Sequence, residues 1–229
     1  MNFSNLKSLA RAYVPGAKTD AVTAVNLALI LNEGALDVAV RTQCMKHYEY
    51  INSVADQTSY RLTSLLPYYV SISSEGVWYK SGTSYIEIIP RTLRYFDNHY
   101  KNWRGVSGTP TEYALWGDLF IPKSYPDEAV TNAFLVYYAQ RPMTMADDGH
   151  YPFHLPDDQI TERSDLAILS DLVLMYTEWK ILKILNKRQD SYEKVNEYLE
   201  EIERRKKLLD LRPDIVSHNE TKFSGPRVG

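Results

Sequence analysis

The pattern of residues 57–141 is the feature that most limits how this chain can fold. Short runs that alternate apolar and polar residues, rich in Tyr, Val, Ile, Thr and Trp, follow one another there. Turn pairs separate several of these runs: Glu75-Gly76, Ser81-Gly82 and Gly117-Asp118. The pattern predicts an antiparallel β meander of about five or six strands. One hairpin is expected around residues 78–85 and another at Gly117-Asp118.

Helical periods precede this segment. A short helix is expected over residues 4–13 and a longer one over residues 19–52, with Thr19 as its N-cap. Gly34 interrupts the longer helix, because an interior glycine costs about 1 kcal/mol relative to alanine. Apolar residues nevertheless recur near the helical period, which is typical of a helix with one apolar face. They are Val22, Val25, Leu29, Leu36 and Val40.

Two more helices are expected after the β segment. Residues 159–187 are apolar on nearly all sides, so their helix is expected at the centre of a helical core. Asp190, followed three residues later by Glu193, resembles a capping box that opens the last helix. Arg212-Pro213 ends it, because the residue before proline avoids the helical region. The apolar stripe of this helix is expected to contain Tyr192, Val195, Leu199, Ile202 and Leu209.

The order of these segments predicts an α+β fold, a helical bundle with an inserted antiparallel β module and an extended C-terminal arm. The N-terminal helices occupy residues 1–56 and the β module residues 57–141. A polar loop and the two C-terminal helices occupy residues 142–212. Residues 213–229 show no periodicity, and two interpretations stay open: a frayed terminus, or an arm that orders on binding a partner.

Length and composition narrow the class of protein. The 229 residues are 44% hydrophobic and 24% charged, which suits one large globular domain or two small ones. A net charge of -3 gives no sign of a nucleic-acid-binding protein. Cys44 is the only cysteine, which suits a reducing compartment, and polar residues interrupt the longest apolar segment, so no membrane span or signal peptide is expected. The 18 tyrosines fit a β-rich fold, a partner-binding surface, or both.

The residues with reactive side chains do not form a recognisable catalytic motif. The nucleophile-elbow, phosphate-loop, dinucleotide-binding and HExxH motifs are all absent. Cys44 lies near His47, but without a third orienting group a buried structural thiol is the favoured interpretation. The charges of residues 200–207 fit the helical pairs Glu200–Arg204 and Glu203–Lys207. We therefore expect no enzyme activity.

A group of acidic residues and histidines has the residue types of a metal site but not its spacing. Pro152 prevents His150 and His154 from sharing a helix face. A solvated loop whose aspartates cap the next helix is the favoured interpretation, and neither metal nor cofactor is expected. The group consists of Asp147, Asp148, His150, His154, Asp157 and Asp158.

Basic and aromatic residues alternate between positions 91 and 104. Such a combination binds single-stranded nucleic acid through charge and stacking. No helix or strand of a sequence-reading motif accompanies it, so contacts with other subunits or with DNA that passes unread are alternatives. We expect Tyr95, Phe96 and Trp103 to anchor this segment to the β module. The basic residues are Arg91, Arg94, Lys101 and Arg104.

Five motifs follow one another between residues 19 and 212: AVRTQCMKHYEYI, QTSYRL, LRYFDNHYKNWRGVSGTPTEYALWGDLFI, LVYYAQRPMTMADD and LPDD. In the most distinctive motif, Trp-Arg is followed by Gly-x-Pro, a tyrosine and a Gly-Asp hairpin. In this order the motifs resemble the head-to-tail adaptor (connector) proteins of tailed double-stranded DNA bacteriophages, including the tail tubular gatekeeper adaptors. The segment FIPKSYPDEAV matches only part of the family's next strand, which leaves the type of phage open.

The resemblance implies a non-enzymatic virion protein at the head-tail interface, assembled in the host cytoplasm. It implies a homo-oligomeric ring, expected to be a dodecamer, beneath the portal protein. Tail or nozzle proteins attach to this ring, and genomic double-stranded DNA passes through its lumen during ejection. The C-terminal arm would then grip the portal, with Phe223, Pro226 and Arg227 as candidate contacts. The residues alone also suit an alternative, a β module on a helical stalk that binds glycan or single-stranded nucleic acid.

Overall fold

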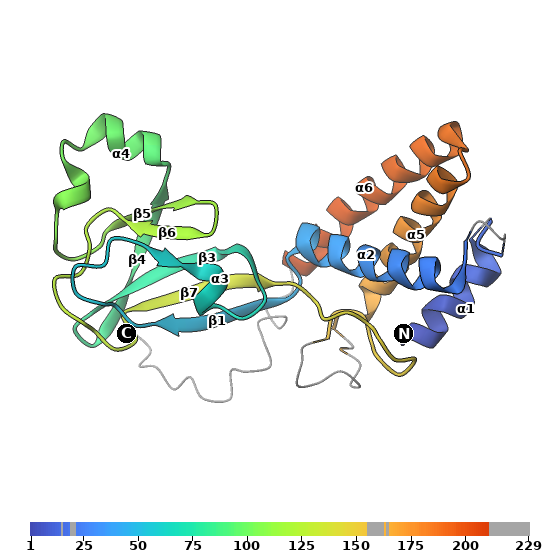
Figure 1. The fold of residues 1–229 in the computed structure, drawn as a ribbon, viewed down its shortest axis with the longest axis horizontal. Helices are drawn as coiled ribbons and strands as arrows, with labels where there is room; N and C mark the ends of the chain where they lie inside the picture. The colour runs from blue at the N-terminus through green and yellow to red at the C-terminus, as the bar shows by residue number, and fades with distance from the viewer. Residues whose placement is uncertain (15, 19–21, 155–162, 164, 211–229) are drawn as a thin grey trace. The chain divides into compact units, whose positions relative to one another are not determined.

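The chain divides into two compact units, a helical unit and a sheet unit (Figure 1). A computed structural model describes residues 1–14, 16–18, 22–154, 163 and 165–210. The helical unit contains Met1–Met45 and the described residues from Arg141 onward, and the sheet unit is Lys46–Gln140. The separation of helices and strands into different parts of the chain confirms the predicted α+β class.

Four α-helices form the described part of the helical unit, and α2, α5 and α6 pack against one another. The first helix, α1, confirms the short helix predicted over residues 4–13, and it packs against α2 and α5. A β-carbon added at Gly34 would lie 3.1 Å from the ring of Tyr176 and 3.3 Å from Val173, so the glycine lets α2 approach α5 closely. The helices are α1 (Phe3–Tyr13), α2 (Ala24–Thr42), α5 (Ser170–Ile184) and α6 (Arg188–Asp210), with a 3-10 turn η2 (Ala167–Leu169) before α5.

Helix α2 is shorter than predicted at both ends. Its N-cap is Thr23, whose hydroxyl accepts a hydrogen bond from the backbone N–H of Asn26 at 3.1 Å, while Thr19 lies outside the described residues. Gln43 ends the helix in the left-handed conformation, at φ 50°. Residues 46–51 therefore form a strand rather than the end of a helix. The prediction of a helix up to residue 52 is wrong because Gln43 redirects the chain.

Four of the five apolar residues predicted to recur along this helix do not form its buried face, whereas the fifth, Val22, is buried just before α2 begins. Leu27, Ile30, Leu31, Ala35 and Val38 pack into the helical core. Val25, Leu29, Leu36 and Val40 instead lie on the opposite side, with exposed fractions from 39% to 69%. Helix α2 thus has apolar residues on both faces. The residues that the helical period indicated in the sequence lie on the exposed face.

The buried face of the last helix matches the predicted apolar stripe only in part. Tyr198 and Ile202 are buried because the Tyr198 ring packs edge-on against Tyr176 and its hydroxyl donates to Asp37 at 2.6 Å. Tyr192 and Leu199, predicted in the apolar stripe, are exposed, whereas Ile202 and Leu209 are buried as predicted.

The start of α6 differs from the predicted capping box. The helix begins at Arg188, so Asp190 lies inside its first turn, where a carboxylate suits the positive end of the helix dipole. The charge pairs differ too, because Glu201 binds both Arg204 and Arg205. The preceding helix, predicted over residues 159–187, is shorter: α5 begins at Ser170, after the 3-10 turn η2, and ends at Ile184. Residue 159 and the pair Arg212-Pro213 lie outside the described residues.

The sheet unit contains a seven-stranded sheet in the order β1-β7-β3-β4-β5-β6-β2. Its strands are β1 (Lys46–Ile51), β2 (Tyr60–Arg61), β3 (Tyr69–Ser81), β4 (Ser84–Arg91), β5 (Glu112–Trp116), β6 (Leu119–Pro122) and β7 (Phe134–Gln140). Three short helical segments connect them: α3 (Leu62–Leu65), α4 (Leu93–His99) and the 3-10 turn η1 (Trp103–Gly105).

The sheet is mixed, so the prediction of an antiparallel meander is wrong. Strand β5 runs parallel to β4, because the connection that carries α4 and η1 returns the chain to the same end of the sheet. The last strand, β7, lies between β1 and β3, far from its sequence neighbour β6. Lys46 of β1 pairs with Ala139 of β7, so the first and last strands of the unit begin and end side by side.

Two of the three predicted turn pairs form hairpin turns. Ser81 pairs with Ser84 around a turn with Gly82 at φ 64°, and Trp116 pairs with Leu119 around Gly117-Asp118 with Gly117 at φ 61°. Glu75-Gly76 instead lies within β3, at an irregularity where its register with β7 shifts between Ile72 and Val77. A left-handed Gly76, at φ 72°, suits such a bulge as well as a turn.

Aromatic rings fill the core of the sheet unit. Phe134 lies at its centre, with ring centroids 5.1 Å from Phe120, 5.2 Å from Tyr79 and 5.4 Å from Tyr60. These distances are those of tilted and edge-to-face pairs, which add to the stabilisation from burial. The tyrosines of this chain thus serve in part as core residues.

Candidate interaction surfaces

The segment from Arg91 to Gly105 is held to the sheet by a small aromatic cluster. Thr92 caps α4 by accepting a hydrogen bond from the Tyr95 N–H at 3.1 Å. Phe96 and Trp103 are buried against Ala114 of β5, and the Trp103 indole N–H donates to Asp97 at 2.9 Å. The predicted anchoring role is confirmed for Phe96 and Trp103, with Tyr95 packed at the edge of the cluster.

Two of the four basic residues of this segment are bound by carboxylates. The Nε of Arg91 lies 3.0 Å from Glu112, and the guanidinium also lies over the Tyr95 ring. Arg104 pairs with Asp97 at 2.9 Å and lies over Trp103. These contacts fix the two side chains against the sheet unit and balance much of their charge.

Arg94 and Lys101 are exposed and form no ion pair with any residue that the structure describes. They are the cations of this segment that remain available to an external partner. The structure therefore divides the four predicted contact residues into a bound pair and an available pair.

Glu112 of β5 is the carboxylate that binds basic side chains in and next to this segment. It is nearly buried and lies 3.5 Å from Lys123 in addition to Arg91. Although burial opposes ionisation, hydrogen bonds from Tyr100 and Arg91 and the charge of Lys123 lower the pKa of Glu112 below its usual range. The same hydrogen bond raises the pKa of Tyr100 to about 12.

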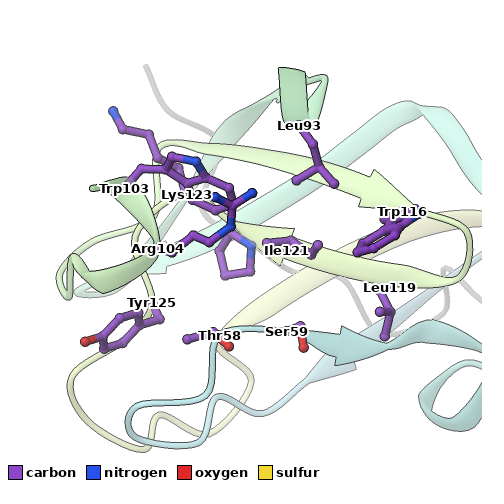
Figure 2. A pocket seen from close by; sticks show the side chains of 11 residues that line it. Thr58, Ser59, Leu93, Trp103, Arg104, Trp116, Leu119, Ile121, Lys123 and Tyr125 are labelled. Atoms are coloured by element: carbon purple, nitrogen blue, oxygen red, sulfur yellow. The ribbon is translucent and has the colours of Figure 1, made fainter. Parts of the chain in front are cut away.

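A cleft of about 260 Å³ opens beside this segment, between α4, η1 and the β5–β6 hairpin (Figure 2). Trp103 and Arg104 lie at one end and Trp116 at the other, and Trp116 is 69% exposed. The residues that line the cleft are Thr58, Ser59, Leu93, Trp103, Arg104, Trp116, Leu119, Ile121, Pro122, Lys123 and Tyr125. Sequence reasoning missed this cleft, although an exposed-face tryptophan beside the Gly117-Asp118 turn is a signal for it.

The cleft differs from a surface for stacking several bases. Phe96 is completely enclosed and Trp103 is only 5% exposed, so neither ring offers a free face. Among the residues that line the cleft, Trp116 is the aromatic residue whose ring is largely exposed. One exposed indole suits a single side chain or sugar ring better than a run of nucleotides.

The helical unit offers a second kind of surface. The outer face of α2, formed by Val25, Leu29, Leu36 and Val40, lies in solvent. Beside it, a hollow of about 420 Å³ lies between α2 and α5. Lys180 spans one side of this hollow, with its Nζ 3.1 Å from Glu33. The lining residues are Asn26, Leu29, Ile30, Glu33, Lys180, Lys183 and Ile184.

The structure describes the surroundings of several residues that were considered for catalysis or metal binding. Cys44 is buried after the end of α2, and burial raises the pKa of its thiol to about 11. His150 Nδ1 accepts hydrogen bonds from the backbone N–H groups of Ala146 and Asp147, and its ring lies beside that of His154. Within the described ranges, no three His, Cys, Asp or Glu residues are placed to hold a metal ion.

The remaining predicted site residues cannot be placed. Phe223, Pro226 and Arg227, like the rest of residues 213–229, lie outside the described residues. Asp157 and Asp158 of the acidic group do so as well. Among the helices of the described ranges, none is long and apolar enough to cross a membrane.

Exposed apolar helix faces and an aromatic cleft are features of proteins that bind other macromolecules. The described part of this chain has both features, which indicates a class of protein that binds other macromolecules. The family model of the SU10 adaptor protein matches residues 1–213, and the chain belongs to that family. It is therefore an adaptor, a structural component of a bacteriophage virion. A search of curated proteins found no match.

Proposed function

We propose that this chain is the head-to-tail adaptor of a tailed double-stranded DNA bacteriophage. In this proposal it forms a ring, expected to be a dodecamer, beneath the portal, joins the capsid to tail or nozzle proteins, and lines the DNA passage. The observation that carries the proposal is the family match, which extends over both units of the chain. It agrees with the motif order recognised in the sequence.

The two kinds of surface support this role. A ring subunit needs contacts with its neighbours and with the components above and below it. The exposed apolar face of α2 suits contacts between subunits, and the cleft beside Trp116 suits an inserted side chain of a partner. Because contacts are repeated around a ring, each one needs only modest affinity.

Two features of the proposal concern DNA and the portal. Arg94 and Lys101, repeated around the ring, would lie against a neighbouring subunit or against phosphates of the passing DNA without reading its sequence. The arm at residues 213–229, through Phe223, Pro226 and Arg227, would hold the portal and order on binding.

The test is a phage that lacks this gene, supplied with either the full chain or a chain truncated after residue 212. We expect the full chain to restore infectious particles. The truncated chain should fold normally, which matching circular dichroism and thermal unfolding of the two chains would show. Phage supplied with the truncated chain should nevertheless produce filled heads without tails. Completed particles with the truncated chain would contradict the proposal that the arm holds the portal. Tailed particles without any adaptor would contradict the function itself.

The exposed indole of Trp116 favours examining the alternative, a sheet unit that binds glycan or single-stranded nucleic acid. Tryptophan fluorescence can be titrated with mixed-sequence oligonucleotides and with glycans, using Trp116→Ala as the control. For an adaptor we expect no saturable, salt-sensitive change. Tight binding that the substitution removes would support the alternative.

A further inference from the structure

We propose that the outer face of α2 packs against α6 of a neighbouring copy of this chain, with Tyr192 of that copy seated in the hollow between α2 and α5. The inference rests on the proposed ring for the existence of a neighbour. It adds which two faces meet, and it makes the contact heterologous, the type that closes into a ring.

The composition of α2 indicates that both of its faces are covered in the assembled state. A helix at a protein surface normally carries polar residues on its outer side, and a helix that is apolar all round is normally buried. Four exposed residues on one side of α2 are apolar: Val25, Leu29, Leu36 and Val40. The carboxylate among them, Glu33, is bound by Lys180, and the exposed polar residues Asn26 and Arg41 lie near the two ends of the helix. A second copy is the occupant that an assembling subunit always has available.

The matching surface lies on α6. Tyr192 is 65% exposed and Leu199 is 37% exposed, and both lie on the side of the helix next to its buried stripe. They are seven residues apart, as are Leu29 and Leu36 on α2. Seven residues span about 10.5 Å of helix, so the two pairs of apolar side chains have the same spacing. Helices whose apolar residues share this spacing can interdigitate along a common seam.

The residues that line the hollow suit a tyrosine side chain. Leu29, Ile30 and Ile184 supply apolar walls, and Asn26 and Glu33 supply polar groups at the edge for a hydroxyl. Tyrosine combines a flat apolar ring with such a hydroxyl and is enriched at the centre of interfaces. Tyr192 is the exposed aromatic side chain of α6 in the described structure.

The charges beside the two surfaces are complementary. Lys183 lines the hollow and is exposed, and within the described residues it forms no ion pair. Glu193 follows Tyr192 on α6 and is held only by the side-chain amide of Gln189, at 2.7 Å, among the described contacts. Seating Tyr192 in the hollow brings this carboxylate toward the lysine. Opposite charges at the edge of an interface favour one register over others.

The first test compares Leu36→Glu with Leu208→Glu in rings formed on co-expressed portal. The two leucines have nearly the same exposed fraction, 43% and 42%, but Leu208 lies on another side of α6. A charge buried in the seam should lower the yield of rings about tenfold, whereas the control should stay within about twofold of the unchanged chain. Equal yields from both variants would overturn the inference.

The second test identifies the two faces directly. Chains with Leu29→Cys and chains with Tyr192→Cys are co-assembled on the portal and oxidised; the native Cys44 is buried and does not interfere. Disulfide-linked dimers should form in the mixture and in neither variant alone. Dimers from Leu29→Cys alone would show that α2 meets α2 and would overturn the proposed contact.

The charge pair provides an independent check. Lys183→Glu should lower ring yield, and the added change Glu193→Lys should restore it to within about twofold. Rings that form normally but give neither the mixed dimer nor this rescue would overturn the inference and leave the adaptor function intact. If the unchanged chain forms no ring on the portal, the proposed function fails and this inference fails with it.

Discussion

The helical unit and the sheet unit bury apolar surface in different ways. The helical core is mainly aliphatic and depends on the close approach of α2 and α5 at Gly34. The sheet core is built from rings that meet around Phe134. The sheet unit encloses the rings around Phe134 but leaves Trp116 69% exposed, whereas the helical unit leaves four apolar residues exposed along one face of a single helix. Under the contact between copies proposed above, assembly would cover this face of the helical unit.

The largest effect is expected from Phe134→Ala. This side chain is fully buried among three aromatic rings, so its removal should lower the free energy of unfolding of the sheet unit by about 3–5 kcal/mol. Three of the four tryptophans, Trp78, Trp103 and Trp116, lie in the sheet unit and Trp179 lies in α5, so most of the change in tryptophan fluorescence in urea measures unfolding of the sheet unit. Alkylation of the buried Cys44 measures opening of the helical unit. In the Phe134→Ala variant, the urea concentration at the midpoint of this alkylation should stay the same as in the unchanged chain.

Leu31→Ala is the matched change in the helical core. It should advance Cys44 alkylation to lower urea, at a cost of about 2–5 kcal/mol, and leave most of the tryptophan signal unchanged. If both substitutions shift both signals together, the two units unfold as one and the contrast between them loses its energetic meaning.

A smaller effect is expected from Asn32→Ala. The side chain of Asn32 accepts from the Met145 N–H at 2.7 Å and donates to the Met145 carbonyl at 3.2 Å, so it joins α2 to the loop that follows the sheet unit. The substitution leaves these groups of a buried residue unpaired and should cost about 2 kcal/mol. Hydrogen exchange at Met145 should accelerate. Asn26→Ala, at an exposed position of the same helix, should change stability by less than about 0.5 kcal/mol.

The smallest effect is expected from Glu75→Gln in the sheet unit. Burial opposes ionisation of Glu75, but hydrogen bonds from Lys46 and from its own backbone outweigh it and lower its pKa to about 2 from an ordinary value of 4.5. A depressed carboxylate pKa stabilises the fold above pH 4.5, and this stabilisation is lost as the pH falls toward 2. Since water screens the partly exposed pair, we expect a loss of about 1 kcal/mol at pH 7.

Urea unfolding followed by fluorescence at pH 7, 4 and 2 measures this difference. The gap between Glu75→Gln and the unchanged chain should close toward pH 2. Glu87→Gln, an exposed change on the neighbouring β4, should show no such gap. A gap of constant size across the whole range would mean that the Lys46–Glu75 pair is not its cause.

Local patterns predicted those parts of the fold that local contacts determine. Gly117-Asp118 forms its hairpin, and Phe96 and Trp103 anchor their segment, because their partners lie within a few turns of chain or on the next strand. The faces of α2 could not be predicted, since both are apolar and only packing against α5 and α6 selects one. Strand β1 was missed because its partner, β7, is distant in sequence.

The candidate surfaces show the same limit. The basic residues near α4 are visible in the sequence, but Arg91 is bound by Glu112 only through the parallel register of β4 and β5. The cleft beside Trp116 likewise requires the β5–β6 hairpin and residues 58 and 59 to come together. Residue types identified the segment, and tertiary contacts decided which of its side chains remain available.

The pairing of Lys46 with Ala139 has a consequence for how the chain reaches this structure. Once β1 and β7 have paired, the points where the sheet unit begins and ends are neighbours in space. For the helices, the whole of residues 46–140 then counts as a connection of a few residues, because the entropy of closing a loop depends on the distance between its ends. An early β1–β7 pair would therefore shorten the effective loop between α2 and α5, which are remote along the chain. A shorter effective loop should speed the association of these two helices.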